Sequence, residues 1–72
     1  MVEILIIDDE KAIRKTLSEI LSFEGYKIDE AADGEEGLKK FSQKNYDIVL
    51  CNITMTTNHN YRDIRIYFSR FF

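Results

Sequence analysis

The chain has 72 residues, enough for one small domain that buries a modest fraction of its surface. Its formal net charge of -3 provides no electrostatic attraction for nucleic acid, so we expect no nucleic-acid binding. There is one cysteine, Cys51, and we find neither a signal peptide nor an apolar run long enough to cross a membrane. We therefore expect a cytoplasmic protein that does not associate with membranes.

A buried strand is predicted at residues 4–7, where aliphatic residues follow one another without polar alternation. The strand leads into an acidic pair, Asp8 and Asp9. Residues 10–24 form a predicted helix whose apolar face consists of Ile13, Leu17, Ile20 and Leu21. Asp9 is positioned to cap the start of this helix, and Gly25 can end it in a left-handed conformation.

A second strand and helix follow. Residues 27–31 alternate between polar and apolar side chains, which predicts a half-exposed strand at the edge of a sheet. Asp33 and Glu36 have the spacing of a capping box, so we expect a helix over residues 34–44. Its predicted inward residues are Leu38 and Phe41. Gly37 costs about 1 kcal/mol relative to alanine within a helix, and close packing on the sheet would explain its presence.

The organising feature is a third strand over residues 48–51, whose carboxyl end is predicted to deliver Asn52 to an open surface. The order β-α-β-α-β with short loops favours a parallel sheet. If the first strand lies in the middle, giving the order 2-1-3, the carboxyl ends of strands one and three are neighbours at a topological switch point. Asp8, Asp9 and Asn52 would then surround one crevice.

The composition changes near residue 56. Residues 1–55 carry seven basic and twelve acidic side chains, a net charge of -5, whereas residues 56–72 carry three and one, a net charge of +2. The apolar residues over 61–72 fit a helical stripe and a strand alternation equally well. We predict two segments, residues 1–55 and an atypical tail over residues 56–72 that packs on the open sheet edge or on a second chain.

Three motifs, at residues 4–10, 31–38 and 47–55, together resemble the receiver domain of two-component response regulators. The resemblance covers residues 1–55, about the first half of such a domain. It implies an α/β fold: a truncated flavodoxin-like receiver, β-α-β-α-β with parallel strand order 2-1-3, the last two strands missing and an atypical C-terminal segment. Receivers accept a phosphoryl group from a histidine kinase on an aspartate at the end of the third strand.

The resemblance also assigns roles to four positions. Asp8 and Asp9 match the pair that binds Mg²⁺, and Thr54 occupies the position whose backbone carbonyl completes the metal site. Asn52 occupies the phosphoacceptor position, but a neutral amide is a poor nucleophile and cannot form the acyl phosphate. The site has also lost one negative charge. We therefore expect no phosphorylation, no enzymatic activity, and Mg²⁺ binding that is weak or absent.

Simpler interpretations of these residues stay open. Asp8 and Asp9 can stabilise a helix N-terminus, which favours negative charge, and Asn52 can bond to its own loop. For function, we expect a phosphorelay signalling domain that docks a histidine kinase or a phosphotransfer protein. The alternative is a non-catalytic oligomerisation or interaction fragment derived from a receiver. A third strand with a bare edge favours pairing with another chain, so we expect a homo-oligomer, at least a dimer.

Overall fold

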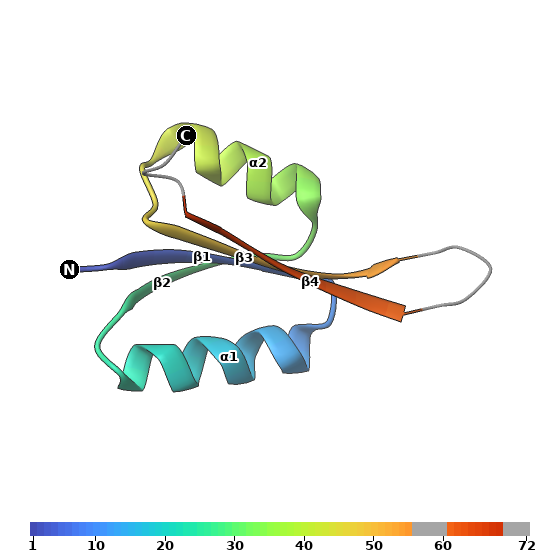
Figure 1. Ribbon diagram of the computed structural model, residues 1–72, viewed down its shortest axis with the longest axis horizontal. Helices are drawn as coiled ribbons and strands as arrows, with labels where there is room; N and C mark the ends of the chain where they lie inside the picture. The colour runs from blue at the N-terminus through green and yellow to red at the C-terminus, as the bar shows by residue number, and fades with distance from the viewer. Residues whose placement is uncertain (56–60, 69–72) are drawn as a thin grey trace.

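The computed structural model describes residues 1–55 and 61–68, with side chains described for residues 1–52. Strands and helices alternate up to the third strand, and the next described element is a fourth strand (Figure 1). In chain order the elements are β1 (Glu3–Asp8), α1 (Lys11–Phe23), β2 (Lys27–Ala31), α2 (Gly34–Gln43), β3 (Ile48–Met55) and β4 (Tyr61–Phe68).

The strands form one sheet in the order β2-β1-β3-β4. The pairs β1–β2 and β1–β3 are parallel, which confirms the predicted order 2-1-3 and the α/β class. Helix α1 covers one face of the sheet and α2 covers the other (Figure 1). Asp8 at the end of β1 lies directly opposite Asn52 on β3 in this register.

The apolar residues over 61–72 fitted both a helix and a strand, and the described part of this segment is a strand. Tyr61–Phe68 is a strand, and it pairs antiparallel with β3 along its whole length, from Met55 opposite Tyr61 to Ile48 opposite Phe68. Residues 56–60 and 69–72 lie outside the described residues. Because β4 supplies partners beyond the end of β1, β3 continues to Met55, and the prediction that it ends at residue 51 is wrong.

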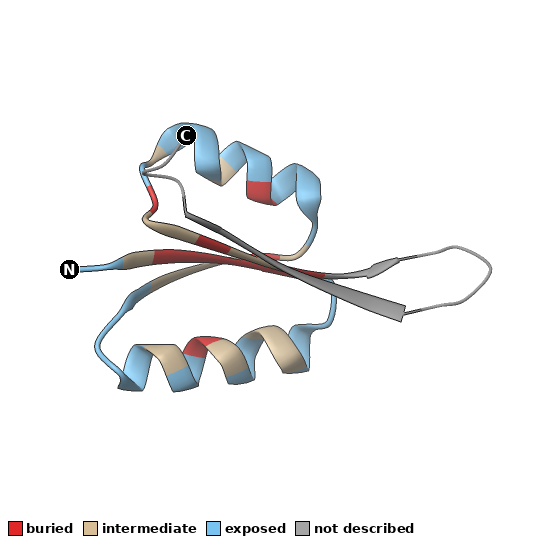
Figure 2. Cartoon of the chain, viewed as in Figure 1, coloured by how far each residue is buried: buried red, intermediate tan, exposed pale blue. Residues whose placement is uncertain are grey.

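The core is centred on β1, as its unbroken aliphatic run predicted. Its four consecutive aliphatic residues are between 0% and 8% exposed because helices pack on both faces (Figure 2). Leu5 and Ile7 join Ala31, Tyr46 and Val49 in one buried cluster. Strand β2, which pairs with β1 on one side, is half-exposed and lies at the sheet edge, also as predicted.

Helix α1 starts one residue later than predicted. Its N-cap residue is Glu10 rather than Asp9, and the side chain of Glu10 makes no capping hydrogen bond. Instead, the Asp8 carboxylate accepts the Glu10 backbone N–H at 2.8 Å. At the other end, Gly25 has φ = 97°, which confirms the predicted left-handed stop.

Helix α2 begins as its sequence predicted. The Asp33 carboxylate accepts the backbone N–H of Glu36 at 2.8 Å, and the Glu36 carboxylate accepts the N–H of Ala32 at 3.2 Å. The helix ends at Gln43, before Asn45. Within the described residues, neither helix is long and apolar enough to span a membrane.

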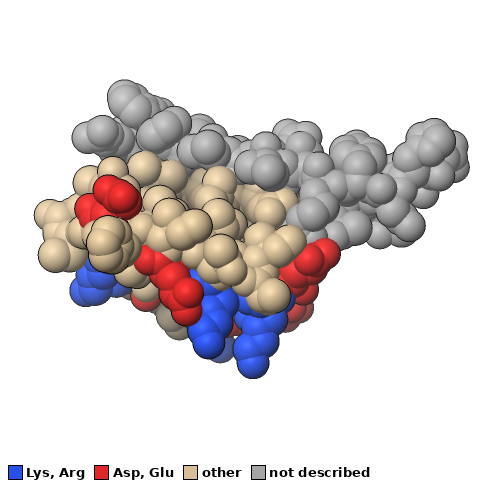
Figure 3. Space-filling model, turned by 90° about the horizontal axis from the view of Figure 1, so that it is seen from below, with Lys and Arg blue, Asp and Glu red and all other residues tan. Residues whose placement is uncertain are grey.

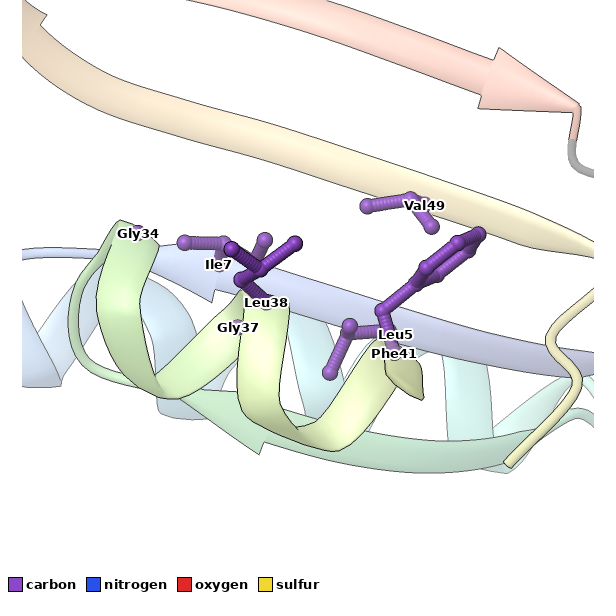
Figure 4. A pocket seen from close by; sticks show the side chains of 7 residues that line it. All are labelled: Leu5, Ile7, Gly34, Gly37, Leu38, Phe41 and Val49. Atoms are coloured by element: carbon purple, nitrogen blue, oxygen red, sulfur yellow. The ribbon is translucent and has the colours of Figure 1, made fainter. Parts of the chain in front are cut away.

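The inward-facing residues of α2 are less buried than predicted. Leu38 is 70% and Phe41 is 41% exposed. Both border an open apolar cavity of about 380 Å³ between α2 and the sheet, lined also by Leu5, Ile7 and Val49 (Figure 4). The two side chains therefore face the sheet side of the helix, but α2 contacts mainly β1 and β2 and does not close the cavity over β3.

Gly37 packs closely against Ile7 of β1. A Cβ at this position would lie 2.4 Å from Cδ1 and 2.8 Å from Cγ1 of Ile7, whereas one at Gly34 would meet nothing within 4 Å.

We expect Gly37→Ala to lower the free energy of unfolding by about 1–3 kcal/mol through overpacking, despite alanine's better helix propensity. Gly34→Ala is the matched control and should be neutral or stabilising. Urea unfolding of both variants tests this, and equal effects would contradict it.

Candidate functional site

The carboxyl ends of β1 and β3 bring Asp8 and Asn52 into direct contact. Both side chains are buried, with 0% and 6% exposure, and the Asn52 Nδ2 donates a hydrogen bond to Asp8 Oδ2 at 3.0 Å. The second carboxylate oxygen, Oδ1, accepts the backbone N–H of Glu10. Each oxygen of the buried Asp8 carboxylate thus accepts an N–H group, which offsets the cost of removing it from water.

Asn52 therefore differs from its prediction in one respect. The sequence predicted that it would meet Asp8, which the structure confirms, and that it would lie on an open surface, which is wrong. The continuation of β3 beyond it places Asn52 inside a strand, between β1 and β4. Its amide is a buried partner of Asp8, rather than a residue exposed at the end of a strand.

Arg14 of α1 is a residue of this region that the sequence interpretation missed. Its side chain is charged but only 15% exposed. Arg14 Nη1 donates to the backbone oxygen of Asp8 at 2.7 Å, and Nε donates to Glu30 Oε1 at 3.2 Å. Its position three residues before Leu17, a residue of the predicted apolar face, was the available signal that it borders the packed face of the helix.

The model of the response regulator receiver domain family matches residues 4–61, most of the chain. The chain belongs to this family. The resemblance seen in the sequence is thereby confirmed, and the match ends at Tyr61, the first residue of β4.

Individual relatives agree with the family assignment. The transcriptional regulatory protein ResD of Bacillus subtilis (strain 168) is 43% identical over 53 residues, covering 74% of this chain and 22% of ResD. The probable transcriptional regulator ycf27 of Guillardia theta is 47% identical over 53 residues, covering 74% of this chain and 21% of ycf27. The chain thus spans about a fifth of the length of these curated relatives.

A solved structure supports the fold. The response regulator TrrA of Thermotoga maritima, crystallised in complex with Mg²⁺–BeF, is similar to this chain with a TM-score of 0.66 and 57% sequence identity. The similarity covers 68% of this chain and 43% of the TrrA chain. The parallel strands and two helices described above are consequently those of a flavodoxin-like receiver.

Asp9 and Thr54, the other two positions to which the resemblance assigns metal binding, lie close to the pair in the sequence. Asp9 follows β1 directly and its side chain is exposed. Thr54 is two residues beyond Asn52, within β3 and opposite Arg62 of β4, and its side chain lies outside the described ones. Within the described part of the chain, no group of three or more histidine, cysteine or acidic side chains has an arrangement that could hold a metal ion.

The donor set at this receiver site fits a Mg²⁺ ion poorly. Mg²⁺ requires an octahedron of oxygen atoms, which the carboxylates of Asp8 and Asp9 could enter. The Asn52 group aimed at Asp8, however, is a nitrogen donor, so it supplies no third oxygen ligand. Turning the amide over would place its oxygen against the Asp8 carboxylate, which is electrostatically unfavourable.

A second polar cluster lies at the opposite, amino-terminal end of the sheet. The hydroxyl of the buried Tyr46 donates to Asp29 Oδ2 at 2.6 Å, and Lys44 Nζ lies 3.3 Å from the same oxygen. The Tyr46 hydrogen bond lowers the pKa of Asp29, with help from Lys44. Burial and the bond to Asp29 raise the pKa of Tyr46 to about 12. These groups bind one another, which makes the cluster structural.

The cluster predicts a pH dependence of stability. Because the folded-state pKa of Tyr46 is raised from 10.0 to about 12, its contribution is complete below pH 10 and is lost as pH rises toward 12. The lowered pKa of Asp29 gives a contribution present above its ordinary value of 3.8 and lost as pH falls below it.

Tyr46→Phe tests this pH dependence. We expect the variant to lose on the order of 1 kcal/mol at neutral pH and to lack the Tyr46 part of the alkaline decline. Denaturant unfolding between pH 3 and pH 12 measures both effects. Tyr26→Phe, at a tyrosine that is 39% exposed, is the control. An identical alkaline decline in wild type and Tyr46→Phe would show that the Tyr46 hydroxyl is not responsible.

Proposed function

We propose that this receiver docks a histidine kinase or a phosphotransfer protein in a two-component phosphorelay without accepting a phosphoryl group itself. The observation that carries this proposal is the buried hydrogen bond of Asn52 to Asp8, at 3.0 Å. It places an amide where the family has its acceptor carboxylate. A neutral amide is a poor nucleophile, and here its nitrogen is already engaged as a donor.

The metal site of this receiver is weak or absent in the proposal. Its members are Asp8, Asp9 and the backbone carbonyl of Thr54, with Asn52 in place of the third carboxylate. When bound, Mg²⁺ would neutralise charge on a transferring phosphoryl group. The amide donor beside Asp8 and the loss of the third carboxylate's negative charge support a low affinity. The receiver then acts by binding partners and is not an enzyme.

The tail over residues 56–72 is proposed to be a segment distinct from the receiver-like residues 1–55. Its support is the antiparallel pairing of β4 with β3, which departs from the parallel order of the first three strands, together with the family match, which leaves out residues 62–72. On the α1 face, acidic and basic side chains lie interspersed (Figure 3). Such a face offers no continuous basic surface, which supports protein partners over nucleic acid or membranes.

A non-catalytic oligomerisation or interaction fragment derived from a receiver is the second candidate. It is favoured by the apolar cavity beside α2, where Leu38 and Phe41 remain exposed on a chain of only 72 residues. We propose that a second copy covers this surface in a homo-oligomer. Light scattering at decreasing concentration tests it, and a cooperatively folding monomer at low concentration would contradict it.

The main proposal is tested with beryllofluoride, the species bound with Mg²⁺ in the TrrA structure. Fluorine NMR should show no bound signal when Mg²⁺ and beryllofluoride are added to wild type, and a bound signal with Asn52→Asp. A bound signal with wild type would overturn the proposal that Asn52 blocks the site. If neither protein gave a bound signal, Asn52 would not be the only feature that prevents beryllofluoride binding. That result would favour the oligomerisation or interaction fragment.

A further inference from the structure

Arg14 connects three elements at the end of β1. It projects from α1, donates through Nη1 to the backbone oxygen of Asp8 at 2.7 Å, and donates through Nε to Glu30 on β2 at 3.2 Å. The side chain is 15% exposed, so both contacts are partly shielded from water. A planar guanidinium suits this double role because its donors have a fixed geometry, which a lysine ammonium lacks.

The bond from Arg14 to the Asp8 backbone oxygen lies just beyond the point where the pairing of β1 with β2 ends. The register between β1 and β2 ends at Ile7 opposite Ala31, one residue before Asp8, while the register with β3 extends to Asp8 opposite Asn52. On the β2 side, Arg14 therefore supplies a donor where the ladder has no further residue pair. The carbonyl that it binds belongs to the planar peptide joining Asp8 to Asp9, so holding its oxygen fixes the direction of both residues.

We propose that Arg14 is a positioning residue of the receiver crevice, which holds the Asp8–Asp9 peptide so that the Asp8 carboxylate meets the residue at position 52. The inference rests on the proposed function, because it assigns a purpose to the crevice. A purely structural tie between α1, β1 and β2 would stabilise the fold without determining the geometry of the Asp8–Asn52 hydrogen bond.

The primary test reads that hydrogen bond directly in the wild-type background. The side-chain NH₂ signals of Asn52 in a proton–nitrogen NMR spectrum report its donation to Asp8. We expect Arg14→Gln to shift these signals and the backbone amide signal of Asp9, and Arg14→Lys to restore them only in part. Lys15→Gln, which removes one positive charge from an exposed neighbouring position of α1, should leave them unchanged.

Two further variants keep the inference testable if Arg14→Gln unfolds. Glu30→Gln weakens one anchor of Arg14 and should shift the Asn52 signals in the same direction. In the Asn52→Asp background, adding Arg14→Gln should weaken Mg²⁺ binding by about tenfold, as loss of an outer-shell partner does. Asn52 signals that move no further in Arg14→Gln and Glu30→Gln than in Lys15→Gln would overturn the inference. Failure of Asn52→Asp alone to bind Mg²⁺ would count against the proposed function instead.

Discussion

Replacing Asn52 with aspartate will destabilise the folded chain in metal-free buffer and make its stability dependent on Mg²⁺. The substitution exchanges the amide that donates to Asp8 at 3.0 Å for a second carboxylate, at a site where both side chains are buried. Losing a buried hydrogen bond to a charged group costs about 1–3 kcal/mol, and the like charges add to this cost. A bound divalent cation would remove the repulsion.

Urea unfolding in EDTA and in Mg²⁺ measures both parts of this prediction. Mg²⁺ at a hundred times its Kd should return about 2.7 kcal/mol to Asn52→Asp and much less to wild type. Asn45→Asp, the same substitution at an exposed position, is the matched control and should change stability by no more than about 0.5 kcal/mol. If Asn52→Asp were as stable as wild type in EDTA, the two side chains could not be in the contact described here.

Leu5→Ala is expected to have the second large effect. Leu5 is fully buried on the central strand, at the floor of the cavity beside α2. Truncating such a leucine costs about 2–5 kcal/mol, a large part of the stability of a domain of this size. We expect most Leu5→Ala molecules to unfold at temperatures where wild type remains folded.

Leu38→Ala is the matched control, because Leu38 lines the same cavity but is 70% exposed. At a protein concentration where the chain is monomeric, this truncation should cost no more than about 0.5 kcal/mol. Urea midpoints of both variants at two protein concentrations give the comparison. If Leu38→Ala cost as much as Leu5→Ala, and more so at high concentration, a second copy would cover the cavity. Equal small costs for the two would contradict the burial of Leu5.

The parts of the fold determined by local patterns were predictable. The aliphatic run of residues 4–7 predicted β1, and Asp33 with Glu36 predicted the start of α2. Each of these signals consists of residues that are close together in the sequence. The extent of β3 was not predictable in this way. It depends on pairing with β4, whose own periodicity fitted a helix equally well.

The candidate site also has features that could be predicted from the sequence and features that could not. The contact of Asp8 with Asn52 followed from the parallel strand order, which brings the ends of β1 and β3 together. The burial of Asn52 did not follow, since it depends on the continued strand. Arg14 was missed because its partners, the Asp8 carbonyl and Glu30, lie on other elements, which the spacing of residues along the helix does not reveal.

Intact mass spectrometry after exposure to an acyl-phosphate donor and Mg²⁺ tests the central claim most directly. The claim is that Asn52 at the acceptor position is what prevents phosphorylation of this receiver. We predict no added phosphoryl group on wild type and one added group on Asn52→Asp, mapped by peptide analysis to position 52. A phosphoryl group on the wild-type peptide that contains Asn52, or none on either protein, would contradict the claim.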